Sequence, residues 1–135
     1  MQNRGSILLI VLLLISVLLL EGAALVKIYM PFQKADLLYF QHLKSYYLAE
    51  SGFALSKKYF ESIPVVADGL SGEQVKNLIS TGLKFEAGLE GKIFLLRSSF
   101  EVFSVGVVGG KYISVLRQDY LVDDGTVVLS NWGKL

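Results

Sequence analysis

The sequence lacks most of the side chains on which enzymes and metal sites are built. It contains no cysteine, which excludes disulfides and thiolate chemistry, although avoiding cysteine does not by itself identify a compartment. His42 is the single histidine and lies in a segment that we expect to be a solvated helix, so no nucleophile–base set can be assembled. No glycine-rich phosphate loop is present. We therefore expect a protein that is not an enzyme and that binds no cofactor.

Charge of one sign is also scarce. The formal net charge of +1 gives no reason to expect a polyanion partner, so no nucleic acid is expected. Asp119, Asp123 and Asp124 cluster near one turn, but a metal site needs more ligands at ordered spacing. Turn chemistry explains these three residues better, and no metal site is predicted.

Long hydrophobic runs are absent except for one, over residues 7–26. Residues 7–20 read ILLIVLLLISVLLL, and Glu21 follows. A bilayer core about 30 Å thick requires about 20 apolar residues in a helix, so this run just suffices. Arg4 precedes it and favours a cytoplasmic N-terminus. We expect a transmembrane segment over 6–27, whose anchor residues are Ile7, Leu8, Leu9, Ile10, Leu14 and Leu20.

Two other interpretations of this run stay open. A secretory signal peptide has a basic start, an apolar region and a small-x-small cleavage site, and Gly22-Ala23-Ala24 would serve as that site. A plain, uncleaved anchor requires nothing further. The rest of the chain, about 110 residues, is enough for one small domain.

The helical pattern continues beyond the membrane over residues 28–63. Pro31 is expected to kink this helix rather than end it, and Pro64 to follow its end. A period of 3.6 residues places small and apolar side chains on one face. The residues expected to pack on a sheet are Leu48, Ala49, Gly52, Leu55 and Tyr59. The many aromatic residues of the helix favour helix–helix packing, because a single-stranded nucleic acid platform would need more interleaved basic residues.

The remainder of the chain changes its pattern twice. Residues 64–91 read as a loop with a short helix over 72–80, which a Ser71–Gln74 capping box introduces. Residues 92–135 are rich in β-branched and aromatic side chains, with Gly109-Gly110 and Asp124-Gly125 as hairpin turns. The four strands expected are 92–97, 101–107, 111–117 and 126–132. The fold class is therefore α+β, a long N-terminal helix packed on a small antiparallel meander.

Three stretches resemble the type IV pilin family and its type II secretion relatives, the pseudopilins. Gly5 directly precedes the apolar helix, and residues 46–53 read YYLAESGF. Residues 100–118, FEVFSVGVVGGKYISVLRQ, are similar to the sheet pattern of minor pilins. Within the family the chain most resembles PilX-like minor pilins and the tip pseudopilin.

The resemblance implies a ladle-like fold and a role in assembly rather than catalysis. Prepilin peptidase would cut between Gly5 and Ser6, so that residues 1–5 are a cytoplasmic leader and the anchor is kept. The C-terminal domain would be extracytoplasmic, and the assembled subunit would belong to a pilus or pseudopilus. The partners implied are other pilin-like subunits, prepilin peptidase, the inner-membrane assembly platform and the lipid bilayer.

Ile10 departs from the family pattern. Most members carry glutamate at this fifth mature position, and Glu21 cannot replace it because it lies about 22 Å along the helix from Ser6. Minor pilins and the tip pseudopilin include members without that glutamate, which favours a low-abundance subunit at a tip or in an initiation complex. The alternatives are an adhesive or DNA-binding minor pilin that uses residues 107–111, and a single-pass anchored protein outside any filament.

Overall fold

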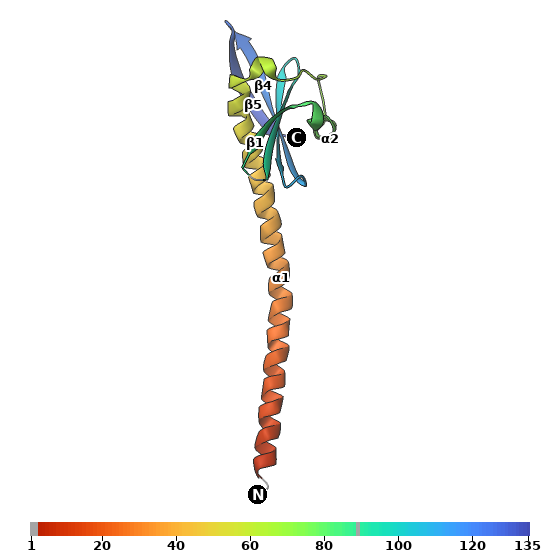
Figure 1. Ribbon diagram of the computed structural model, residues 1–135, viewed down its shortest axis with the longest axis vertical. Helices are drawn as coiled ribbons and strands as arrows, with labels where there is room; N and C mark the ends of the chain where they lie inside the picture. The colour runs from red at the N-terminus through yellow and green to blue at the C-terminus, as the bar shows by residue number, and fades with distance from the viewer. Residues whose placement is uncertain (1–2, 89) are drawn as a thin grey trace. The chain divides into compact units, whose positions relative to one another are not determined.

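The structure, a computed structural model, describes residues 3–88 and 90–135. Contacts divide the chain into two compact units, one up to Leu38 and one from Tyr39 onward. Helix α1 (Asn3–Lys58) forms the described part of the first unit and also enters the second (Figure 1). Of the expected leader, Met1 and Gln2 lie outside the described residues, whereas Gly5 and Ser6 are already helical.

The first unit is the apolar part of α1. Its most hydrophobic window of 18 residues has a mean hydropathy of 2.8, and none of that window is buried inside the structure. This part of α1 is therefore long and apolar enough to cross a membrane. Pro31 lies inside α1, which continues for many residues beyond it, in agreement with the expectation that this proline does not end the helix.

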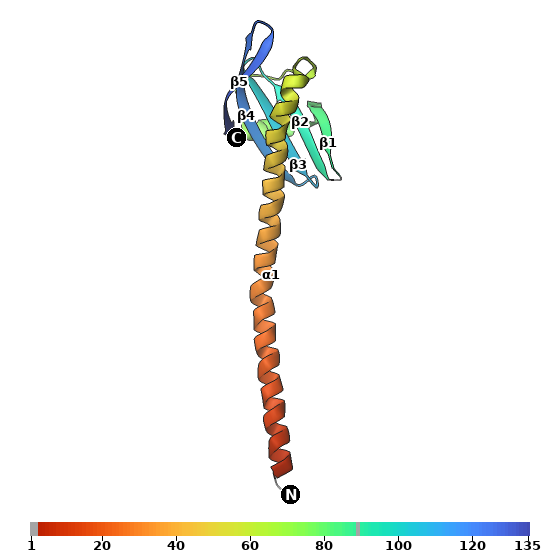
Figure 2. The same ribbon diagram turned by 90° about the vertical axis from the view of Figure 1, so that its left-hand side faces the viewer.

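The second unit contains an antiparallel sheet in which each strand pairs with its neighbours in sequence. Its strands are β1 (Leu83–Ala87), β2 (Gly91–Arg97), β3 (Glu101–Val108), β4 (Tyr112–Asp123) and β5 (Thr126–Lys134). Their order in space is β1-β2-β3-β4-β5, so the sheet is a meander (Figure 2). Together with α1 it gives an α+β layout, as expected.

The sheet has five strands rather than the four predicted. The additional strand, β1, lies in the segment 64–91 that was expected to be a loop, and it pairs with β2 from Leu83↔Leu95 to Ala87↔Gly91. Leu83, Phe85 and Ala87 are half-buried. Lys84 and Glu86, which alternate with them, are exposed. This alternation is that of a half-buried strand, but over only five residues it is a weak sequence signal.

The capping box and the two hairpin turns predicted from the sequence are confirmed by the structure. The Ser71 N–H donates to Gln74 Oε1 over 2.8 Å, and the Gln74 N–H donates to Ser71 Oγ over 3.4 Å, which is the predicted capping box. It introduces α2 (Gly72–Asn77), shorter than expected because a 3₁₀ turn over Ile79–Thr81 follows. Both hairpin turns have positive φ angles, 57° and 69° at Gly109 and Gly110, and 45° and 78° at Asp124 and Gly125. Helix α1 ends at Lys58, before a 3₁₀ turn over Phe60–Ser62 and Pro64.

Both faces of the sheet are covered, which explains why seven of the eight residues of β3 are buried. Residues of α1 from Tyr39 onward cover one face, and the segment that carries α2 covers the other (Figure 1). Val75 of α2 packs with Phe103 and Val105 on its face. Ala49 and Phe53 of α1 pack with Val102 and Leu116 on the opposite face. The sequence analysis assigned only the α1 cover.

Candidate interaction surfaces

The first candidate surface is the apolar part of α1. All six predicted anchor residues are exposed, from 56% at Leu14 to 71% at Leu20. A helix that is apolar around its circumference and uncovered by its own chain is suited to lipid or to other apolar helices. Gly5, at the expected cleavage position, is exposed as well, and a Cβ added there would meet no atom within 4 Å.

The second candidate surface is the contact between α1 and the sheet, which depends on two glycines. Gly52 of α1 is buried, and a Cβ at this position would collide with Ser104 Oγ and come within 2.9 Å of Ile93 Cγ2. Gly106 of β3 lies opposite the Ser45 carbonyl oxygen, and a Cβ there would come within 2.6 Å of the Ala49 backbone nitrogen. Each element thus presents a glycine to the other, and backbone and side chains meet at close range.

The other predicted packing residues of α1 lie around these glycines. Ala49 is fully buried, and Leu48 and Leu55 are half-buried against the cluster of Ile63, Ile93 and Leu95. Tyr59 lies at the edge of the contact, because it is 37% exposed and its ring centroid is 5.2 Å from that of Phe85.

Buried hydroxyl groups form the polar part of this contact. Ser45 Oγ and Ser114 Oγ are 2.7 Å apart, and Ser45 also donates to the His42 carbonyl oxygen over 2.8 Å. Because the single Ser45 hydroxyl proton is used on His42, Ser114 is the donor between the two serines. Ser104 Oγ is buried without a hydrogen-bond partner among the described residues. Ser104, Ser114 and Gly106 were not predicted from the sequence; a glycine within a strand pattern was the signal available for Gly106.

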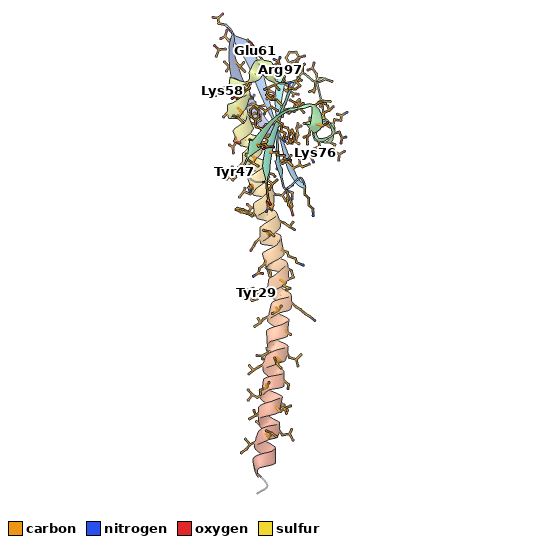
Figure 3. The ribbon with its side chains drawn as sticks, viewed as in Figure 1. Tyr29, Tyr47, Lys58, Glu61, Lys76 and Arg97 are labelled. Atoms are coloured by element: carbon orange, nitrogen blue, oxygen red, sulfur yellow. The ribbon has the colours of Figure 1, made fainter. Side chains whose placement is uncertain are left out.

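A third surface is an aromatic side of α1 that the sheet leaves open. Phe40 is 61% exposed and Tyr47, labelled in Figure 3, is 57% exposed. They line a shallow, almost wholly apolar hollow of about 410 Å³, together with Leu43, Lys44, Leu48 and Ser51. Such a surface is suited to packing against another apolar element.

His42, Asp68 and Glu86 are titratable residues that lie outside these three surfaces. His42 is exposed, with its ring 5.3 Å from that of Tyr112. In residues 3–88 and 90–135, no group of three or more histidine, cysteine, aspartate or glutamate residues could hold a metal ion. The Ser99 N–H donates to Asp68 Oδ1 over 2.7 Å and lowers the pKa of that carboxyl, and Lys84 lowers the pKa of the Glu86 carboxyl. Both carboxyls are exposed.

Comparisons with protein-family models, with curated proteins and with solved structures found no match for this chain. The features of the described residues that bear on function are the exposed apolar part of α1, its glycine–serine contact with the sheet and its open aromatic side.

Proposed function

We propose that this chain is a minor pilin or pseudopilin, a non-enzymatic structural subunit of a type IV filament system that is processed by prepilin peptidase after Gly5. The observation that carries the proposal is that α1 consists of two parts with different surroundings. One uninterrupted helix has an apolar part that its own chain leaves uncovered and a later part that is buried on an antiparallel sheet. A subunit that is stored in a bilayer and later packed among other helices requires both parts.

In the proposed mechanism, the apolar side chains of α1 contact first lipid and then the helices of other subunits. Lipid surrounds residues 7–26 while the subunit waits in the membrane, and the helices of neighbouring subunits replace lipid during assembly. Packing of small and apolar side chains then supplies the contact, as it does between helices within membranes. The domain formed by the sheet stays outside the bilayer and makes the remaining contacts of the subunit.

Ile10 supports an assignment to a tip or an initiation complex rather than to a repeating shaft. It is an exposed aliphatic side chain, 59% accessible, at the position where most family members carry glutamate. An aliphatic group cannot pair with the amino group of a neighbouring subunit. A subunit without that ion pair suits a position that is occupied once.

The test is the processing of the full chain when it is expressed with and without a prepilin peptidase. Intact mass should decrease by residues 1–5 only when the peptidase is present, and Gly5→Val should abolish that decrease. Because a Cβ at Gly5 meets no atom of another element within 4 Å, the substitution displaces no packed neighbour, so a loss of cleavage reports on the peptidase. Cleavage of Gly5→Val at the wild-type rate would contradict the processing assignment.

Gly22→Ala is the matched control, because Gly22 also lies in α1 with nothing within 4 Å of an added Cβ. This variant should be processed like the wild type. A mass loss corresponding to cleavage beside Gly22-Ala23-Ala24, independent of prepilin peptidase, would instead identify a signal peptide. No cleavage, and no release of the protein with sheared filaments, would identify a plain membrane anchor.

A further inference from the structure

The far end of the hairpin β4–β5 is a two-stranded ribbon that the rest of the sheet does not support. Strand β3 pairs with β4 only as far as Glu101↔Asp119, whereas β4 and β5 pair on to Asp123↔Thr126. A register shift between Gln118 and Tyr120 marks a β-bulge at the start of this extension. Such bulges re-aim a strand pair, and a hairpin without further strands is marginally stable by itself.

The ribbon exposes aliphatic side chains on both of its faces. Leu121 pairs with Val128 on one face, and these side chains are 67% and 48% exposed. Val122 pairs with Val127 on the other face, where Val122 is 58% exposed. Aliphatic exposure on both faces of an unsupported ribbon is the pattern of a surface that another molecule covers.

The tip of the ribbon is acidic. Strand alternation places Asp123 on the Leu121 face, and Asp124 follows in the turn. Neither carboxylate makes a hydrogen bond or ion pair with any part of the chain that the structure describes. The Leu121 face is therefore aliphatic and negatively charged.

A basic and aromatic cleft lies on the other face of the same ribbon. It has a volume of about 730 Å³ and is bounded by the end of α1, by Arg97 of β2 and by the ribbon residues Val122 and Val127. The charged residues of the cleft are Lys57, Lys58, Arg97 and Glu61, which together carry a net charge of +2. Figure 3 shows Lys58, Glu61 and Arg97 at the same end of the second unit.

The Arg97 guanidinium is fixed in place without a carboxylate partner. Its Nε donates to the Ile63 carbonyl oxygen over 3.1 Å, and its Cζ lies 4.6 Å from the centre of the Phe60 ring. Among the described residues, the ion pairs are Lys84–Glu86 and Arg117–Glu101, so no acidic side chain of the chain neutralises Arg97. A half-buried, held guanidinium is well suited to bind a carboxylate from outside.

We propose that two copies of this chain associate head to tail through this end, with the acidic, aliphatic face of the ribbon of one copy in the basic, aromatic cleft of the other. Each copy carries both halves of the contact, but they cannot meet within one chain, because Asp123 and Leu121 point away from the cleft that Val122 lines. Because the two halves lie on opposite faces of the ribbon, the contact is heterologous, and it leaves one free tip and one free cleft to which further copies can add. The proposal does not depend on the filament role.

Charge-reversing substitutions in the cleft and at the tip test the contact. The full chain is studied in detergent micelles, and its association is measured by sedimentation at a series of protein concentrations. The cleft variant is Lys57→Glu with Lys58→Glu. The tip variant is Asp123→Lys with Asp124→Asn, since asparagine tolerates the positive φ of 45° at that position. Each variant alone should dimerise about 10-fold more weakly than the wild type or worse, because like charges then face each other. An equimolar mixture of the two should dimerise again, since every charge contact in the mixed pair is attractive.

Lys76→Glu with Lys92→Glu is the matched control, because it makes the same change in charge at exposed lysines outside the cleft. It should dimerise like the wild type. A wild type that stays monomeric, or association that is equal in all variants and therefore due to the apolar helix alone, would overturn the proposal. Binding of an acidic partner protein by a monomeric wild type would likewise replace it.

The absence of cysteine permits a second, independent measurement. A copy with Val128→Cys mixed with a copy with Lys58→Cys should give a disulfide-linked pair under mild oxidation. A mixture of Val128→Cys and Lys76→Cys should give none above background. Equal cross-linking in both mixtures would show that the contact is not the one proposed.

Discussion

Gly52 of α1 and Ser104 of β3 are in direct contact, the helix backbone against the serine hydroxyl. The pair combines two features that are each unfavourable alone. Glycine within a helix costs about 1 kcal/mol relative to alanine, and Ser104 Oγ is buried without a hydrogen-bond partner among the described residues. Neither residue can be exchanged for a larger one without moving the other, so the pair fixes how closely α1 approaches the sheet.

Gly52→Ala should destabilise the second unit despite the gain in helix propensity. The new methyl group would overlap Ser104 Oγ and crowd Ile93. Overpacking typically costs about 1–3 kcal/mol, which the propensity gain of about 1 kcal/mol only partly offsets. Denaturant unfolding in micelles, followed by near-ultraviolet circular dichroism, measures the change. Ser51→Ala, an exposed change one residue earlier, should shift the unfolding free energy by less than about 0.5 kcal/mol.

Ser104→Ala should leave stability unchanged or raise it by up to about 1 kcal/mol, because it removes an unpaired buried hydroxyl without opening a large void. The same change removes the atom that blocks Gly52→Ala. The double variant should therefore be more stable than the sum of the two single changes predicts. Strict additivity of the two single changes would show that the hydroxyl is not the obstacle.

Gly106→Ala should be more damaging than Gly52→Ala. The added Cβ would meet the Ser45 carbonyl oxygen and the Ala49 nitrogen, which are backbone atoms of α1 and cannot rotate away. We expect a loss of about 3 kcal/mol or more, or a second unit that no longer packs on α1. Gly133→Ala is the control, since Gly133 lies in β5 with nothing within 4 Å of an added Cβ. Resistance to limited proteolysis distinguishes the two, and equal resistance would contradict the assignment.

The Ser45–Ser114 hydrogen bond should appear as a coupling between α1 and β4. A double-mutant cycle to alanine should give a coupling energy of about 1 kcal/mol, the usual net value for a hydrogen bond. Ser45→Ala removes the acceptor of the Ser114 proton, and Ser114→Ala removes the donor. A coupling near zero would mean that the two hydroxyls are satisfied separately in solution.

Low pH should decrease the unfolding free energy of the second unit, because Asp68 is then protonated. Its folded pKa is lowered from the ordinary value of 3.8, chiefly because the carboxylate accepts the Ser99 N–H. The folded protein therefore binds its proton less readily than the unfolded chain does, so this stabilisation is complete above about pH 4 and disappears as the pH falls through the lowered value. Asp68→Asn should flatten the pH dependence of unfolding in that range.

Features that depend on neighbours along the chain could be predicted from the sequence, whereas strand β1 and the second cover of the sheet could not. The apolar run, the capping box at Ser71 and the paired-residue hairpin turns each depend on interactions between neighbours along the chain. Strand β1 depends instead on an edge offered by β2, and five residues are too few to signal it. The short helix that carries Val75 was predicted, but its packing on the sheet was not, because six residues are too few to define an apolar helical face.

In the contact between α1 and the sheet, only the residues contributed by α1 were predicted. The small-residue face of α1 could be identified from the spacing of Ala49 and Gly52, because helical periodicity determines which residues share a face. The residues that they meet, Ser104 and Gly106, depend on the register of β3, and sequence periodicity does not determine which strand lies under a given helical turn. Cleavage after Gly5 and the family assignment remain predictions.

The meander has a consequence for how this chain folds. Every strand pairs with the strand before or after it in sequence, so each hairpin closes a short loop and pays little chain entropy. The link between α1 and β4 is different, since Ser45 and Ser114 are 69 positions apart. The low-contact-order sheet can therefore form hairpin by hairpin, whereas docking of α1 has to await a distant partner. A nascent chain already held in a bilayer by residues 7–26 would make that search shorter, because one end of the loop is then fixed in place.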